Sequence, residues 1–155
     1  MRMYIYLIIA LLVVVIFLAL QQNQANLLQA PGISARLKIF LTSHQADISR
    51  DPVLPELRSP VFKLTQQQLF EKLPAVVASL DWQPVQTDNK NFSLKAVVST
   101  PIIGFKDDVE ISVVADAQQS YLIATSRSRV GKADFAANTH HLQQLLMAIE
   151  QADRQ

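Results

Sequence analysis

Six polar side chains in the second half of the chain have types and spacing that could do chemistry. They are Asp107, Asp108, Arg127, Arg129, Asp134 and Asn138. Two arginines can receive an anionic group through paired N–H donors, while neighbouring carboxylates orient their guanidinium groups. The same residues could also be purely structural, because carboxylates and arginines pair across neighbouring strands. The residue types alone leave both interpretations open.

A predicted β-hairpin would bring these residues to one place. Val109 to Ala115 alternates apolar and polar residues, the period-two pattern of a strand with one buried face, and Tyr121 to Thr125 is a second apolar strand. The polar segment Asp116 to Gln119 between them suits a hairpin turn. Antiparallel pairing would place the two aspartates, which precede the first strand, beside the two arginines, which end the second. We therefore expect these four charges at one end of the sheet.

Two amphipathic helices are predicted to accompany the hairpin. The first begins at Thr65, which has the spacing of a capping box with Gln68, and Pro74 should kink it or divide it in two. The second begins near Phe135, with Asp134 as its N-cap, and carries one apolar face. The start of this second helix would lie beside the charged end of the sheet.

Further strands complete a small sheet. Phe92 to Val98 alternates as a half-buried strand, and Trp82 to Thr87 is a candidate edge strand. Such a sheet has one face to bury, so both helices should lie on that face. The predicted fold class is α+β: a two-layer sandwich of a three- or four-stranded antiparallel meander sheet with two amphipathic helices on one face, plus one N-terminal transmembrane helix.

An apolar run near the start of the chain predicts the transmembrane helix. Met3 to Leu20 holds no charged or strongly polar group, and at about 1.5 Å per residue it measures roughly 27 Å, close to the ~30 Å hydrocarbon core. The run is longer than the apolar part of a typical signal peptide, so we expect an uncleaved signal anchor, with a cleaved signal peptide as the alternative. Arg2 favours a cytoplasmic N-terminus. The domain would then lie outside, in the periplasm of a Gram-negative bacterium.

The sequence divides into three predicted parts. Residues 1–20 are the transmembrane anchor, residues 21–53 are a linker and extended strap, and residues 54–155 are the soluble α+β domain. The strap is expected to lack regular structure because prolines recur at its end and just beyond it.

Composition excludes several classes of function. The formal net charge is +1 and the basic residues are scattered, so nucleic acid is not an expected partner. The chain has no cysteine, which excludes disulfides, thiol nucleophiles and cysteine-ligated metals. Its three glycines form neither a dinucleotide fingerprint nor a P-loop. His44, His140 and His141 lack metal-ligand spacing, and the sequence indicates no cofactor and no metal site.

Two segments carry a family signature. GFKDDVEI, from Gly104, and ATSRSRVGKADFAAN, ending at Asn138, resemble domain of unknown function family 1499. The matching positions are Phe105, Asp107, Asp108, Val109, Ser126, Ser128, Arg129, Gly131, Asp134 and Asn138. The sequence departs from the family pattern at Ala133, where Ser is usual, at Phe135 for Leu, at Ala136 for Gly and at His141 for Arg. The resemblance extends over roughly Leu54 to Ile149 and implies no established activity.

These observations together favour a non-catalytic module at a membrane. We expect a binding or envelope-assembly module, with an anionic small molecule or an envelope protein as the possible partner of the six polar residues. One alternative is a hydrolase-like enzyme that uses the two aspartates and two arginines. It is disfavoured because consecutive strand residues such as Asp107 and Asp108 point to opposite faces. The other alternative is a lipid-contacting module with an apolar groove near Ile102 and Ile103.

Overall fold

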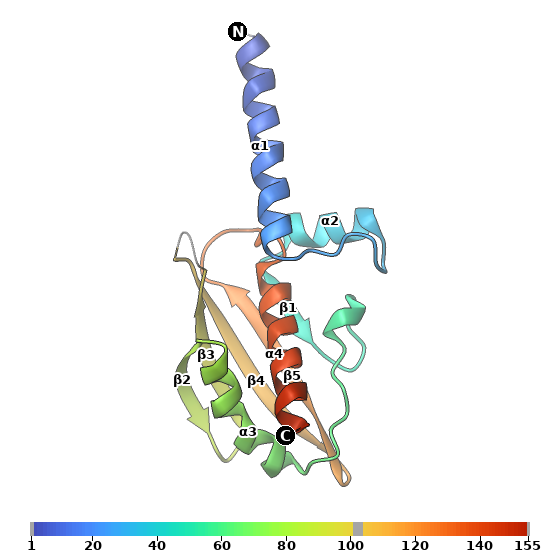
Figure 1. Ribbon diagram of the computed structural model, residues 1–155, viewed down its shortest axis with the longest axis vertical. Coiled ribbons are helices and arrows are strands. Elements are labelled where there is room, and N and C mark those ends of the chain that lie inside the picture. Colours follow the sequence, from blue (N-terminus) through green and yellow to red (C-terminus); the bar gives the residue numbers. More distant parts are fainter. Residues whose placement is uncertain (1, 101–103, 155) are drawn as a thin grey trace.

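The centre of the domain is one antiparallel sheet, seen in a computed structural model that describes residues 2–100 and 104–154 (Figure 1). The strands lie in the order β1-β5-β4-β3-β2. Their bounds are β1 Gln45–Ile48, β2 Gln83–Asp88, β3 Ser93–Ser99, β4 Lys106–Asp116 and β5 Gln119–Ser128. The last four form the predicted meander, with β2 at one edge. The sheet has one strand more than the prediction allowed, because β1 joins the open side of β5.

The β4–β5 hairpin forms as the sequence predicts. Its strands pair in register from Asp107 opposite Ser128 down to Asp116 opposite Gln119. Along β4, alternate side chains are buried, which confirms the period-two pattern. The register brings the start of β4 and the end of β5 to the same end of the sheet.

Two helices cover one face of the sheet, which confirms the two-layer α+β arrangement (Figure 1). They are α3, Gln66–Ser79, and α4, Ala137–Asp153. Each contributes fully buried leucines to the shared core, such as Leu73 and Leu145, and burying a side chain of this size stabilises a fold by about 1.5–3 kcal/mol.

The start of α3 confirms the predicted capping box. Thr65 Oγ1 accepts from the Gln68 N–H at 3.3 Å, and Gln68 Oε1 accepts from the Thr65 N–H at 2.9 Å. The predicted division at Pro74 does not occur, because α3 continues through it as one helix. Pro74 lies on the exposed side of α3, where water can satisfy the carbonyl that its missing N–H leaves free.

Residues 21–53 were expected to be a linker and an extended strap without regular structure, and this was wrong for residues 33–48. Ile33–Thr42 forms helix α2, and β1 follows it, before the short helix η1, Pro55–Leu57. The prolines that were expected to break regular structure all lie after β1, so they interrupt neither element. Phe40 of α2 is 1% exposed and belongs to the domain core.

The N-terminal helix α1, Arg2–Gln22, projects from the domain, and α2 lies across its base (Figure 1). Helix α1 is apolar along nearly its whole length, and most of its side chains are exposed. By length and composition, α1 could be a membrane anchor or a signal sequence. Its last turns differ from the rest, because Leu20 is 6% exposed and Ile16 packs against the domain core.

Candidate functional site

The structure brings all six predicted site residues to one end of the sheet but divides them between two faces. Asp108 pairs with Arg127 across β4 and β5, while Asp107 pairs with Ser128. The pleat therefore points Asp107 toward the helices, where it is 1% exposed, and turns Asp108 to the open face, where its side chain is 51% exposed. Asp134 and Asn138, from the segment that leads into α4, lie on the buried side.

On the open face, both arginines already have partners. Arg129 donates to Asp108 through two nitrogens, with Nη2 2.7 Å from Oδ1 and Nε 3.0 Å from Oδ2. Arg127 Nε donates to Gln45 Oε1 at 2.9 Å. The hydrogen bond from Arg129 lowers the pKa of Asp108, so this carboxylate is ionised at neutral pH and cannot act as an acid. An incoming anion would compete with Asp108 and Gln45 for the Nε and Nη2 donors of these guanidinium groups.

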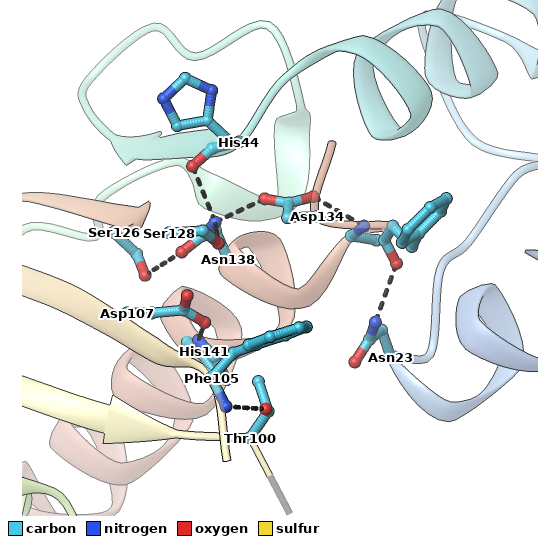
Figure 2. A network of polar contacts seen from close by, with 12 residues as sticks. Asn23, His44, Thr100, Phe105, Asp107, Ser126, Ser128, Asp134, Asn138 and His141 are labelled. Atoms are coloured by element: carbon cyan, nitrogen blue, oxygen red, sulfur yellow. Dashed lines mark hydrogen bonds and ion pairs between the residues drawn. The ribbon is translucent and has the colours of Figure 1, made fainter. Parts of the chain in front are cut away.

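On the buried face, Asn138 is the centre of a polar network (Figure 2). Its Oδ1 accepts from the Ser126 hydroxyl at 2.6 Å. Its Nδ2 donates to Ser128 Oγ at 2.9 Å, to Asp134 Oδ2 at 2.6 Å and to the main-chain oxygen of His44 at 3.0 Å. Because Asn138 is fully buried, these contacts take the place of its hydrogen bonds to water. The network joins α4 to β5 and to the start of β1.

Asp107 and His141 form a pair beneath this network. His141 Nδ1 lies 3.5 Å from Asp107 Oδ2 (Figure 2), and among the described residues neither of these atoms has a hydrogen-bond partner. Burial raises the pKa of Asp107, and the nearby Ser128 hydroxyl partly offsets that rise. Burial, with a smaller contribution from His140, lowers the pKa of His141 to about 4. His141 is therefore neutral at pH 7 and gives Asp107 no cationic partner, unlike the Arg of the family pattern.

Asp134 does not occupy the predicted N-cap, and α4 does not begin near Phe135. The helix begins at Ala137, with Ala136 as its N-cap in the left-handed region at φ 71°. Phe135 is also left-handed, at φ 52°, and its N–H is held by the Phe40 carbonyl of α2 at 3.1 Å. Asp134 instead accepts from the Ala136 N–H at 2.9 Å, two residues ahead. Burial raises the pKa of Asp134, and its bonds to Asn138 and Ala136 partly offset the rise.

The same turn is fastened to the end of α1. Asn23 Nδ2 donates to the main-chain oxygen of Phe135 at 2.9 Å (Figure 2). Sequence reasoning missed Asn23 and assigned its surroundings to a linker. No local signal could have identified it, because its partner is a main-chain atom 112 residues away.

A separate cavity of about 390 Å³ lies between α2, β1 and the segment that follows β1. Its lining includes Ile39, Ala46, Leu54, Leu57 and Thr139, and none of the six predicted site residues. Ile102 and Ile103, near which a lipid groove was expected, lie outside the described residues.

The chain belongs to the family described as protein of unknown function DUF1499, whose model matches residues 35–149. The match confirms the resemblance read from the signature and begins within α2, earlier than the expected Leu54. No curated protein matches the chain. Among 21 matching chains of solved structures is the crystal structure of Ara h 8.0201, with 10% identity, a TM-score of 0.48, and coverage of 72% of this chain and 97% of that chain.

Proposed function

We propose that this protein is a non-catalytic module of the cell envelope, and that its family signature builds the joint between an uncleaved N-terminal anchor and the domain. The observation that carries the proposal is the buried network around Asn138. Ser126, Ser128 and Asp134 direct their polar groups to Asn138 rather than to solvent. This network holds the turn before α4 through Asp134 and Ala136, and the main-chain oxygen of Phe135 in that turn accepts the hydrogen bond from Asn23.

The packing of the last turns of α1 supports an uncleaved anchor. Leu20 belongs to the domain core and Ile16 packs against it. Cleavage after Leu20 would remove both side chains and uncover the apolar residues beneath them. A domain that matured by losing this helix would not be expected to use it as part of its core.

The division of the two aspartates supports a non-catalytic role. A substrate in solvent can reach Asp108, but Arg129 holds that carboxylate as the ionised partner of an ion pair. Burial raises the pKa of Asp107, the direction that acid catalysis favours, but Asp107 faces His141 inside the domain. The two carboxylates therefore cannot act on one substrate from the same side of the sheet.

The orientation of the anchor follows from the ends of α1. Arg2 begins the helix, and no basic residue follows it until Arg36 and Lys38, a pattern that favours a cytoplasmic N-terminus and an external domain. In a Gram-negative bacterium the domain would then lie in the periplasm.

Membrane fractionation tests the proposal. The full chain, carrying one epitope at each end, is expressed in a Gram-negative host, and the membranes are washed with alkaline carbonate. We expect both epitopes on one polypeptide in the membrane pellet, and loss of the C-terminal epitope when protease is added to spheroplasts but not to intact cells. Recovery in the soluble fraction, or loss of the N-terminal epitope, would contradict the anchor.

A separate assay tests the absence of catalysis. The purified full chain is incubated with chromogenic ester, phosphate, glycoside and peptide substrates, and we expect no turnover above that of the buffer. Turnover that is abolished by Asp108→Asn would contradict the non-catalytic assignment.

A further inference from the structure

We infer that the domain surface around the base of α1 inserts into the headgroup region of the membrane that α1 enters. The lipid surface would then be a second binding partner, in addition to the hydrocarbon core around α1. This inference rests on the proposed function, in which α1 is an uncleaved anchor.

The length of α1 fixes the depth of the domain. The apolar run Met3 to Leu20 measures roughly 27 Å at about 1.5 Å per residue, so all of it is needed to cross a hydrocarbon core of ~30 Å. Leu20 must then lie at the boundary between hydrocarbon and headgroups. Leu20 itself belongs to the domain core, so no free linker holds the domain away from the bilayer.

Exposed apolar side chains occur on the segments at this boundary. Leu28 is 85% exposed, Ile33 51%, Phe105 48% and Val130 64%. They come from the loop after α1, the start of α2, the start of β4 and the end of β5, and Figure 1 places these segments at the level of the base of α1. We call these four residues the rim. Apolar side chains at a lipid interface are buried among the upper acyl chains.

The charges beside the rim also suit a lipid surface. Lys38, Lys106 and Lys132 are exposed on α2, on β4 and in the loop before α4. On the described parts of these segments, the carboxylates of Asp107 and Asp134 turn inward, and that of Asp108 is paired with Arg129. The outward charge is therefore positive, as required next to anionic headgroups. Lysine side chains can keep their ammonium groups at headgroup level while their stems lie against apolar surface.

The position of α1 identifies the bilayer as the occupant of this surface. If α1 spans the membrane, lipid surrounds the base of this helix. A protein partner would have to displace that lipid to reach the rim. Other exposed apolar residues, such as Val85 on β2 and Met147 on α4, lie on elements that point away from α1 (Figure 1). Met147 is 59% exposed and provides a control closely matched to Val130.

Depth-dependent fluorescence quenching tests the inference, and the absence of cysteine makes single-site labelling direct. Full-length Val130→Cys and Met147→Cys are labelled with a small environment-sensitive fluorophore. They are reconstituted into phosphatidylcholine–phosphatidylglycerol vesicles that contain a lipid with a spin label near its headgroup. We expect the label at residue 130 to be quenched several-fold more than the label at residue 147. Equal quenching at the two sites would overturn the inference.

Two further variants keep the result decisive. Leu28→Cys replaces Val130→Cys if the latter does not fold, with the same expected contrast to Met147→Cys. Val13→Cys, in the middle of α1, is measured with a lipid spin-labelled deep in its acyl chain. Strong quenching at residue 13 without quenching at the rim would overturn the inference and leave the anchor standing. No quenching at residue 13 would contradict the anchor, and the inference with it.

Discussion

Asp107 and Asp108 are neighbours in sequence, but the first is buried 3.5 Å from His141 and the second is held by Arg129 on the open face of the sheet. The family signature therefore has two parts with different surroundings. One part is an interior network whose groups have little access to water, and the other is a surface ion pair. Substitutions in the two parts should have very different effects on stability.

Asn138→Ala should lower the free energy of unfolding by about 3 kcal/mol, because it leaves the buried hydroxyl of Ser126 and the carboxylate of Asp134 without their partner. Arg129→Ala removes only a solvent-exposed pair and should change the stability by much less. Urea denaturation of the full chain in detergent micelles measures both. Equal losses in the two variants would contradict the division of the signature into interior and surface.

His141 should make stability depend on pH. Its pKa is about 4 in the folded domain against 6.5 for an ordinary histidine, so the unfolded chain binds more protons between these values. Stability from this residue is therefore complete above pH 6.5 and is lost as the pH falls toward 4, by up to about 3 kcal/mol.

His141→Gln isolates this effect. The raised pKa values of Asp107 and Asp134 act in the opposite direction, because these groups stabilise the fold as the pH falls. Both aspartates are present in the variant, so they largely cancel in the difference between the two proteins. Thermal unfolding from pH 7.5 to pH 4 should show the wild type losing stability relative to His141→Gln, and parallel profiles would contradict the assignment.

Ala136→Gly should stabilise the protein by about 0.5–1 kcal/mol. Ala136 has φ 71°, a region that costs an alanine of the order of 1 kcal/mol and that glycine adopts freely. The family pattern has glycine at this position, which agrees with the backbone found here. Ala148→Gly, inside α4, is the matched control and should destabilise by about 1 kcal/mol. Destabilisation by both substitutions in urea titrations would show that the methyl group of Ala136 matters more than its backbone strain.

Arg36→Lys should destabilise the region around α2 at the base of α1. Arg36 is fully buried, donates to both oxygens of Glu56 at 2.7 Å, and also holds the main-chain oxygen of Ala30. Lysine keeps the charge but cannot make these parallel contacts, so we expect a loss of about 2 kcal/mol and faster hydrogen exchange over residues 29–42. Lys38→Arg on the exposed side of α2 is the control, and it should leave the exchange unchanged.

The parts of the fold that could be predicted are those that depend on short-range sequence patterns. The alternation in β4, the capping box at Thr65 and the apolar faces of α3 and α4 each depend on residues within a few positions of one another. Residues 21–53 could not be predicted in this way. Helix α2 is fastened by Arg36 to Glu56, 20 residues away, and β1 pairs with a strand nearly 80 residues further along the chain.

The candidate site was predictable in position but not in its contacts. The hairpin register was sufficient to bring the aspartates and arginines to one end of the sheet, and the pleat alone implied that Asp107 and Asp108 diverge. The partners of Asn138 depend on where α4 crosses β5, which no spacing in the sequence specifies. The two left-handed residues before α4 moved its start beyond the position that Asp134 indicated.

The attachment of Asn23 to Phe135 and of Leu20 to the core has a consequence for how this molecule meets its neighbours. A domain on a flexible tether adopts many orientations relative to its anchor. This domain is packed on α1, so the two should rotate together. If α1 is the proposed anchor, other proteins in that membrane would meet the domain in one orientation. The β4–β5 tip would stand no more than about 37 Å beyond the start of β4, since the strand has 11 residues of about 3.4 Å each. A partner in the membrane would then find the domain by lateral diffusion alone, with the height and the orientation of the domain already set by α1.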